Sequence, residues 1–196
     1  NIIYQELSLI NELSIAENIF VGKIPTKKVM GMDVVDYKSM YDVTNELLNK
    51  LGLKRQPDTL VEELSVAEKQ LVEIAKALAA DSKVLIMDEP TSALSDKEIE
   101  RLFEIIEDLK KQGVGIIYIS HKLKEIKQIG DRVTVLKDGK YIDTKDLADT
   151  EQEELISLMV GRELQEKYLS TQSSQKGEEV IFEVKNLTRQ DEKVKN

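Results

Sequence analysis

The alternation of apolar and polar positions predicts a strand, a helix and a second strand in the middle of the chain. Val84 to Met87 are four consecutive apolar residues, and Gly115 to Ile119 form a second short apolar run. Short runs that are apolar on both faces are typical of strands in a parallel sheet covered on two sides. Between them, residues 95–111 carry apolar side chains at 3.6-residue spacing and stop before Gly113. We therefore predict a βαβ unit with two parallel strands.

Residues 38–80 are predicted to form helices upstream of this unit. One apolar stripe ends at Gly52; it consists of Met40, Val43, Leu47, Leu48 and Leu51. A second stripe follows Ser65, which forms the Ser-x-x-Glu pattern of a capping box with Glu68. Capping alone explains this pattern in most proteins, but a helix N-terminus also presents free amides and a positive dipole end to an anion. Both interpretations stay open.

Turn signals predict a hairpin and a last helix downstream. Asp138-Gly139 separates two β-type runs, which favours a hairpin that closes the sheet over residues 83–144. Thr150 and Glu153 are predicted to cap an amphipathic helix that stops at Gly161.

Residues with catalytic potential follow the two predicted strands. Asp88 and Glu89 come directly after the first apolar run, and His121, the only histidine, follows the second. Because the carboxyl ends of neighbouring parallel strands lie at one edge of a sheet, we expect His121 to lie near the two acids. Asp88 is placed to hold a metal ion, directly or through water, and Glu89 to polarise a water that attacks a terminal phosphate. A polar turn after a strand, with a bystander histidine, would explain the same residues.

Five motifs in one order resemble those of the ATP-binding subunits of ABC transporters. They are similar to the Q-loop glutamine (Gln5), the signature loop (Leu64 to Gln70), the Walker B strand (Val84 to Glu89), the D-loop (Ser92 to Asp96) and the switch histidine (His121). Five motifs at the family's spacing are far more specific than any one of them. Two further phrases resemble the monosaccharide-importer branch, in which one polypeptide carries two nucleotide-binding domains: Val72 to Leu78 and Met159 to Arg162.

The resemblance implies an α/β fold of the P-loop NTPase class, with a parallel sheet flanked by helices and a helical signature subdomain. It implies that Glu89 orients the hydrolytic water, that His121 contacts the γ-phosphate of ATP, and that Asp88 and Gln5 hold Mg²⁺. The other implied nucleotide-binding residues are Gln5 and, acting across an interface with another nucleotide-binding domain, Ser65, Val66, Ala67 and Glu68. The implied D-loop residues are Ser92, Ala93, Leu94 and Asp96.

The signature segment departs from the family pattern. Val66 and Ala67 stand where many members have two glycines, and Glu68 stands where glutamine is usual. Glycine permits close approach of the backbone to a phosphate. A methyl group at 67 and a carboxylate at 68 are therefore hypothesised to weaken contact with the γ-phosphate.

A phosphate-cradling Gly-x-x-x-x-Gly-Lys-[Ser/Thr] segment occurs nowhere among the nine glycines. We therefore expect a fragment without the N-terminal Walker A lobe, by truncation or as a natural short product, and without ATP hydrolysis of its own. Residues 1–168 are expected to be a partial first nucleotide-binding domain, made of a Q-loop region with a basic loop at Gly22 to Lys28, a helical subdomain and a Walker B and switch lobe (1–37, 38–80 and 81–168). A linker over 169–179 and the start of a second nucleotide-binding domain over 180–196 are expected to follow.

Composition limits the partners of the chain. The 28 Lys and Arg against 37 Asp and Glu give a net charge of −9, which disfavours nucleic acid. No apolar run approaches the roughly 20 residues of a membrane span. The absence of cysteine excludes disulfides, and the lack of a signal peptide is typical of a cytoplasmic protein.

The resemblance implies the ATP-hydrolysing subunit of a sugar ABC importer, with ATP and Mg²⁺ as cofactors. Such a subunit is peripheral, on the cytoplasmic face of the cell membrane. Its partners would be membrane permease subunits and, through them, a sugar-binding protein. The alternatives are a non-catalytic module that supplies only the signature helix, and a non-transport ABC ATPase of translation or DNA repair. The sequence does not indicate which sugar or nucleoside is carried.

Overall fold

The computed structural model describes residues 1–80 and 82–160 of the chain. The chain divides into two compact units. Among these residues, the first consists of Asn1–Val133 with Asp146–Ala148, and the second of Thr134–Lys145 with Asp149–Val160. The sheet and its helices belong to the first unit.

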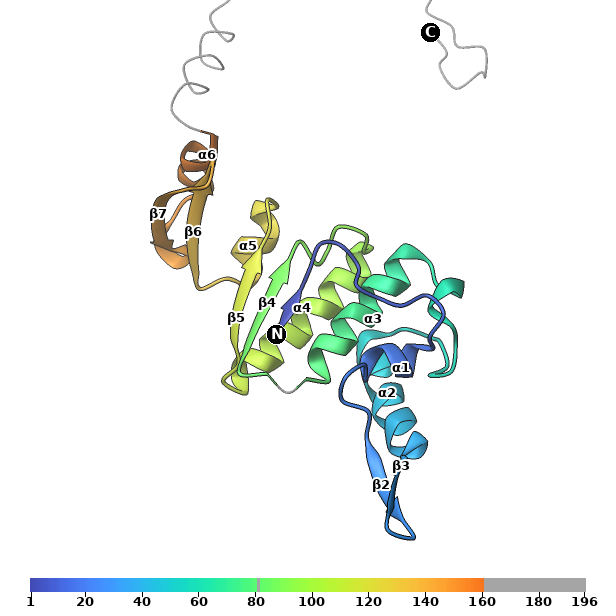
Figure 1. Ribbon diagram of the computed structural model, residues 1–196. Helices are drawn as coiled ribbons and strands as arrows, with labels where there is room; N and C mark the ends of the chain where they lie inside the picture. Colours follow the sequence, from blue (N-terminus) through green and yellow to red (C-terminus); the bar gives the residue numbers. More distant parts are fainter. Residues whose placement is uncertain (81, 161–196) are drawn as a thin grey trace, which may run out of the picture. The chain divides into compact units, whose positions relative to one another are not determined.

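A parallel three-stranded sheet of order β1-β4-β5 forms the centre of the first unit (Figure 1). Its strands span Ile2–Ile3 (β1), Val84–Asp88 (β4) and Gly115–Ile119 (β5). Helix α4, Asp96–Lys111, connects β4 to β5, which pair in parallel. The predicted βαβ unit is thus confirmed, and all three strands end at the same edge of the sheet.

The other helices of the first unit are α1 (Ile15–Ile19), α2 (Tyr37–Leu51), α3 (Val66–Leu78) and α5 (Leu123–Ile129), with 3₁₀ turns at Val61–Glu63 and Leu147–Asp149. Of these, α2 and α3 match the helices predicted over residues 38–80, whereas α1 and α5 were not predicted. The predicted capping box of α3 is present, because the side chains of Ser65 and Glu68 each accept from the other residue's backbone amide. Helix α2 ends at Gly52, which has the left-handed φ of 72° that glycine adopts without steric cost.

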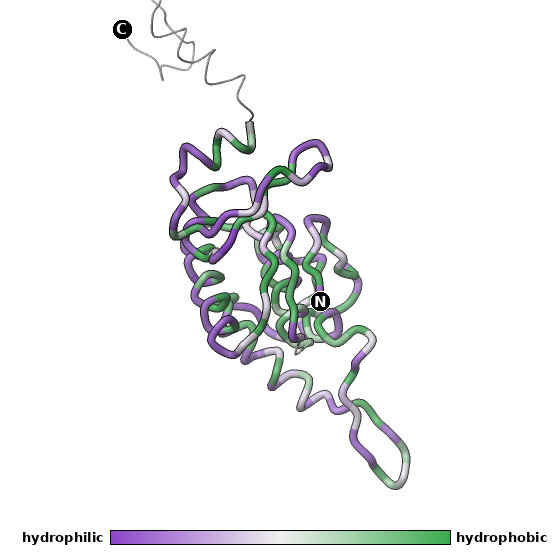
Figure 2. Tube along the Cα trace, turned by 90° about the vertical axis from the view of Figure 1, so that its left-hand side faces the viewer, coloured by the Kyte–Doolittle hydropathy of each residue, from purple (hydrophilic) through white to green (hydrophobic). Residues whose placement is uncertain are grey.

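One face of the sheet carries the core. Register places Ile3, Met87 and Tyr118 side by side on this face, together with Leu85, and all four pack with residues of α3 and α4 in one apolar cluster. Helices α3 and α4 lie along this side of the sheet (Figure 1). Hydrophobic residues, green in Figure 2, run through the strands, whereas the helices alternate with hydrophilic purple.

The opposite face of the sheet differs from the prediction. We expected strands buried on both faces, but Ile117 is 52% exposed and Ile119 47% exposed. Val84 and Ile2 are also exposed, so no helix among the described residues covers this face. The apolar run from Val84 to Met87 indicated a strand in a parallel sheet. It carries no information on which segment of the chain covers each face of that sheet.

A hairpin begins within the segment that was predicted as a basic loop, Gly22 to Lys28, and continues beyond it. Strands β2, Thr26–Val29, and β3, Met32–Val35, pair antiparallel in a separate two-stranded sheet. Met30 and Gly31 form the turn with φ of 52° and 85°, the positive values that two-residue hairpin turns require. The β2–β3 hairpin was not predicted from the sequence because it buries almost no apolar surface. Met30 in its turn is 96% exposed, and the hairpin carries hydrophobic stretches, green in Figure 2, away from the core.

The predicted Asp138-Gly139 hairpin forms, but it does not close the parallel sheet. Strands β6, Arg132–Lys137, and β7, Lys140–Asp146, make a two-stranded sheet of their own. Helix α6, Gln152–Val160, follows as predicted. Turn signals specify a hairpin locally but not the sheet that it joins. The predicted stop at Gly161, the end of the 159–162 phrase, the linker and the second domain lie outside the described residues.

Within residues 1–80 and 82–160, no helix is both long and apolar enough to cross a membrane.

The end of α2 is held by an arginine from α4. Arg101 donates from Nε to the carbonyl of Lys50 at 2.5 Å and from Nη2 to the carbonyl of Asn49 at 2.8 Å. These carbonyls belong to the last turn of a helix, where intrahelical donors run out, although the Asn49 carbonyl also accepts from the amide of Gly52 at 3.1 Å. The contact couples the helical segment to the helix that crosses over the sheet.

We predict that Gly52→Ala destabilises the chain more than Gly113→Ala. Both glycines have left-handed φ, 72° and 83°, so each alanine costs about 1 kcal/mol of strain. A Cβ at 52 would also lie 2.9 Å from Nη1 of Arg101, whereas nothing lies within 4 Å at 113. Urea unfolding in the wild-type and Arg101→Ala backgrounds measures the difference. Equal losses in the wild-type background would contradict the proposed contact.

Candidate functional site

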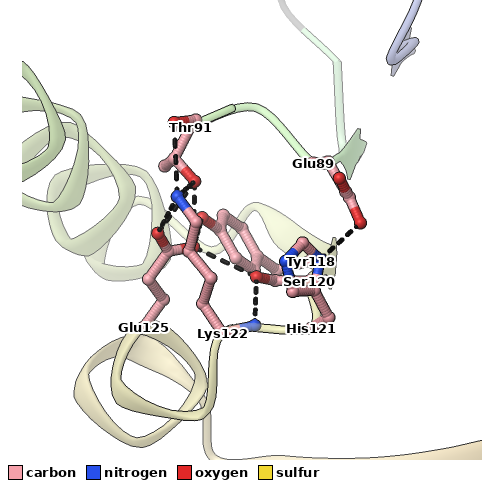
Figure 3. Close-up of polar contacts among 7 residues, drawn as sticks. All are labelled: Glu89, Thr91, Tyr118, Ser120, His121, Lys122 and Glu125. Carbon is pink, nitrogen blue, oxygen red and sulfur yellow. Dashed lines mark hydrogen bonds and ion pairs between the residues drawn. The ribbon is translucent and has the colours of Figure 1, made fainter. Parts of the chain in front are cut away.

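The two predicted catalytic side chains meet at the carboxyl edge of the sheet. Glu89 follows β4 and His121 lies two residues after β5, and His121 Nδ1 is 2.8 Å from Glu89 Oε1 (Figure 3). The glutamate is largely shielded and the imidazole is exposed. The expected approach of the only histidine to the paired acids is therefore found. Asp88 ends β4 in register with Ile119 of β5, so it lies at the same edge.

Glu89 adopts a strained backbone conformation. Its φ is 45°, in the left-handed region that residues with a side chain rarely occupy. Its amide donates to the carbonyl of Ile119 at 3.0 Å, and its carbonyl accepts from the amide of Ser92 at 3.3 Å. Strain of this kind costs on the order of 1–3 kcal/mol and clusters at functional sites. The turn directs the Glu89 side chain away from the strand and toward His121.

A buried carboxylate that sequence reasoning missed lies beside this pair. Glu125, in the first turn of α5, is only 6% exposed. It accepts hydrogen bonds at 2.8 to 3.1 Å from the hydroxyls of Thr91, Tyr118 and Ser120, and Lys122 Nζ lies 3.1 Å from Oε1 (Figure 3). Thr91 is itself 2% exposed. We call these five residues the Glu125 cluster.

The cluster keeps Glu125 ionised. Burial by itself would raise the pKa of Glu125, but the hydrogen bonds from Thr91, Tyr118 and Lys122 outweigh it and bring the pKa below the ordinary value. Burial, reinforced by the hydrogen bond to Glu125, raises the pKa of Tyr118 well above its ordinary value. Tyr118 therefore stays a neutral donor to a charged acceptor, which is among the stronger kinds of hydrogen bond.

The predicted Q-loop glutamine lies at the same sheet edge. Gln5 is exposed and follows β1, whose Ile3 pairs with Met87. The loop after it is tied to α3, because the buried Glu73 accepts from the amide of Ser8 at 2.5 Å and from its hydroxyl at 2.8 Å. This tether was not predicted, since Glu73 is one of many charged residues on a helix.

The signature residues form the first turn of α3. Ser65 and Val66 are exposed, and Ala67 and Glu68 are partly buried. Arg55 pairs with Glu68 through two nitrogens, at 2.7 and 3.3 Å. Mainly because of this pairing, the pKa of Glu68 falls to about 2. The hydrogen bonds of this turn go to Arg55 and within the turn itself, and none of the described ones joins it to Glu89 or His121.

The predicted D-loop residues form the turn between β4 and α4. Leu94 packs on the core, and its amide donates to the carbonyl of Thr91 at 3.3 Å. Ser92 is exposed and Ala93 is partly buried. Asp96 opens α4, where Glu98 accepts from the amide of Ser95 at 2.7 Å. The turn therefore starts at Glu89 and ends in a capped helix.

The residues at this edge fit a magnesium ion shared with phosphates. Mg²⁺ in phosphate-binding sites usually takes one or two carboxylates and completes its shell with phosphate oxygens and water. Asp88 offers one carboxylate at the end of β4, and Gln5 follows the neighbouring strand β1 by two residues. Over residues 1–80 and 82–160, no group of three or more His, Cys, Asp or Glu is arranged to hold a metal by itself. The donor set therefore suits an ion that arrives with a nucleotide.

Comparison with known proteins assigns this arrangement to a family. Residues 1–92 match the model of the ABC transporter family. The chain is 47% identical over 188 residues to the galactose/methyl galactoside import ATP-binding protein MglA of Clostridium tetani, covering 96% of this chain and 37% of that protein. It is 45% identical over 194 residues to the D-allose import ATP-binding protein AlsA of Escherichia coli, covering 98% and 38%. The chain thus spans little more than a third of the curated relatives that it matches.

Solved structures agree on the fold. A dimeric, post-hydrolysis structure of the ATP-binding cassette MJ0796 bound to ADP and Pi superposes with a TM-score of 0.64 at 24% identity, over 74% of this chain and 62% of that one. At this identity the likeness establishes the fold alone. The sequence relatives and the family model carry the assignment further, and the chain belongs to the family of ABC transporter ATP-binding proteins.

Proposed function

We propose that the protein containing this chain is the ATP-hydrolysing subunit of an ABC importer for a monosaccharide. The observation that carries the proposal is the contact of 2.8 Å between Glu89 and His121 at the edge where Asp88 also ends its strand. The relatives named above, and a putative ribose/galactose/methyl galactoside import ATP-binding protein of Burkholderia cenocepacia at 50% identity, are all named for sugar import. Which sugar is carried is left open by this range of names.

The proposed chemistry begins with Glu89. As general base, its carboxylate accepts a hydrogen bond from a water molecule, orients it for in-line attack on the γ-phosphorus of ATP and takes the water's proton as the bond to ADP breaks. When protonated, His121 donates through both ring nitrogens, from Nδ1 to Glu89 and from Nε2 to a phosphate oxygen. The positive charge of the imidazolium thereby stabilises the negative charge that develops on the phosphoryl group during transfer. Bound Mg²⁺, held by Asp88 and Gln5, would neutralise the phosphate oxygens.

The remaining site residues act on neighbouring surfaces in this proposal. Ser65, Val66, Ala67 and Glu68 present the N-terminus of α3 to a nucleotide held by another nucleotide-binding domain, and Ser92 to Asp96 lie at the same domain interface. Hydrolysis then opens that interface and moves membrane permease subunits, which receive the sugar from a binding protein. The subunit would lie at the cytoplasmic face of the membrane.

A non-catalytic module is the second candidate. It is favoured by one observation, namely that the first turn of α3 is exposed at Ser65 and Val66 and that none of its described hydrogen bonds joins it to Glu89 or His121. Such a module would supply the signature turn of α3 to a partner domain without turning over ATP. The two candidates differ in whether Glu89 matters for turnover in a full-length subunit that contains this sequence.

We predict that Glu89→Gln in that full-length subunit lowers kcat for ATP hydrolysis by about 100-fold or more, as loss of a general base does. ATP binding should be retained, because the amide keeps the size of the side chain. A phosphate-release assay and nucleotide titration measure the two quantities, with the exposed Glu100→Gln on α4 as control. A Glu89→Gln subunit that hydrolyses ATP at the wild-type rate would favour the non-catalytic module.

The Arg55–Glu68 pair bears on the hypothesis of a weakened signature turn. The Arg55 guanidinium offsets the charge of Glu68 where a γ-phosphate would approach. In our proposal the methyl group of Ala67 therefore hinders phosphate more than the carboxylate of Glu68 repels it. The hydrogen bonds of Glu68 also tie the loop that carries Arg55 to α3.

We predict that Glu68→Gln destabilises the chain by about 1 kcal/mol at pH 7, a modest value because the pair is partly exposed. The pKa of Glu68 is depressed, so its stabilisation is complete above the unfolded value of 4.5 and is lost as pH falls toward about 2. Urea unfolding at several pH values, with the exposed Glu62→Gln as control, should show the two proteins converging below pH 4.5. A difference that does not change with pH would contradict the ion pair.

A further inference from the structure

We infer that Glu125 is the positioning residue that sets the distance between Glu89 and His121. The inference rests on the proposed function for its consequence in catalysis, but its structural content stands apart from ATP. Glu125 touches neither side chain of the pair directly. It acts through the backbone segments that carry them.

The hydrogen-bond partners of Glu125 lie close in the chain to both Glu89 and His121. Thr91 lies two residues after Glu89, and its hydroxyl is 2.8 Å from Glu125 Oε1. Ser120 and Lys122 lie immediately before and after His121, and both reach the same carboxylate, at 3.1 Å each. The buried carboxylate of Glu125 therefore contacts the turn after β4 and the residues on both sides of His121 (Figure 3).

Cross-links within the cluster make the arrangement rigid. Lys122 Nζ is 3.1 Å from the Thr91 hydroxyl, and the Lys122 amide donates to the Ser120 hydroxyl at 3.0 Å. Tyr118 contributes a further hydroxyl at 2.8 Å from within β5, and its ring packs edge-on against Phe103 in the core. A buried carboxylate is tolerated only where its acceptor sites are filled. Removing its charge should therefore loosen every segment that it holds.

His121 provides a direct probe, because it is the only histidine in the chain. When the ring is neutral, the Glu89 carboxylate accepts a hydrogen from Nδ1 and so favours the Nδ1–H tautomer. A free imidazole prefers Nε2–H. The ¹⁵N shifts of the ring in this chain at alkaline pH therefore report whether the pair is formed, with Glu89→Ala as the reference for a released ring.

We predict that Glu125→Gln moves the His121 tautomer ratio most of the way toward that of Glu89→Ala. Thr91→Val and Tyr118→Phe, which each remove one hydroxyl and keep the shape, should move it in the same direction by less. The exposed Glu100→Gln and the core variant Leu48→Ala serve as controls for charge and for lost stability, and both should leave the ratio at the wild-type value. If Glu125→Gln does not fold, the Thr91 and Tyr118 variants decide. A wild-type ratio in the folded variants would overturn the inference.

Steady-state kinetics in the full-length subunit test the consequence. Glu125→Gln should lower kcat by about 10- to 100-fold, with KM for ATP changed less than about twofold, because misplacement of the pair affects the chemical step and not binding. An unchanged kcat beside an active wild type would overturn the inference. A wild-type subunit without ATPase activity would instead contradict the proposed function, and the tautomer measurement would still decide the role of Glu125.

Discussion

The register between β4 and β5 is the constraint on which the site depends. Asp88 pairs with Ile119, so Glu89 and the segment leading to His121 leave the sheet at the same level. Parallel pairing with an intervening helix gives the strands a common carboxyl edge. A shift of β5 by one residue would turn Tyr118 out of the core and would separate Glu89 from His121. The apolar packing of α3 and α4 on one face therefore fixes the geometry of the polar edge.

Buried carboxylates fasten the loops that leave this edge. Glu125 holds the segments around Thr91 and Ser120, and Glu73 holds Ser8 in the loop after Gln5. Each carboxylate is shielded from water and accepts more than one hydrogen bond, so the loss of one donor removes part of the compensation for burying its charge. The strained φ of 45° at Glu89 lies in the turn that leads to Thr91, whose hydroxyl donates to Glu125. The packing of the core therefore determines where the strands end, and the carboxylates of Glu125 and Glu73 determine the paths of the loops that follow them.

Sequence predicted most of the fold because its signals are local. Glu68 three residues after Ser65, and the Asp138-Gly139 turn, specify a capping box and a hairpin within a few residues, and both form. The meeting of Glu89 and His121 followed from the parallel topology alone. Other features depend on contacts between distant segments. The Thr91–Glu125 bond joins residues 34 apart, and a Glu in the first turn of a helix is ordinary. The β2–β3 hairpin and the exposed sheet face were missed because periodicity does not show what covers a surface.

The most direct test of the account is a double-mutant cycle on Glu89 and His121 in the full-length subunit, with kcat for ATP hydrolysis as the readout. If the two side chains work as one unit, Glu89→Ala and His121→Ala will each remove most of the activity, and the double variant will lose little more than either single variant. If instead the two losses multiply, the contact of 2.8 Å does not couple the residues in turnover, and the central claim fails.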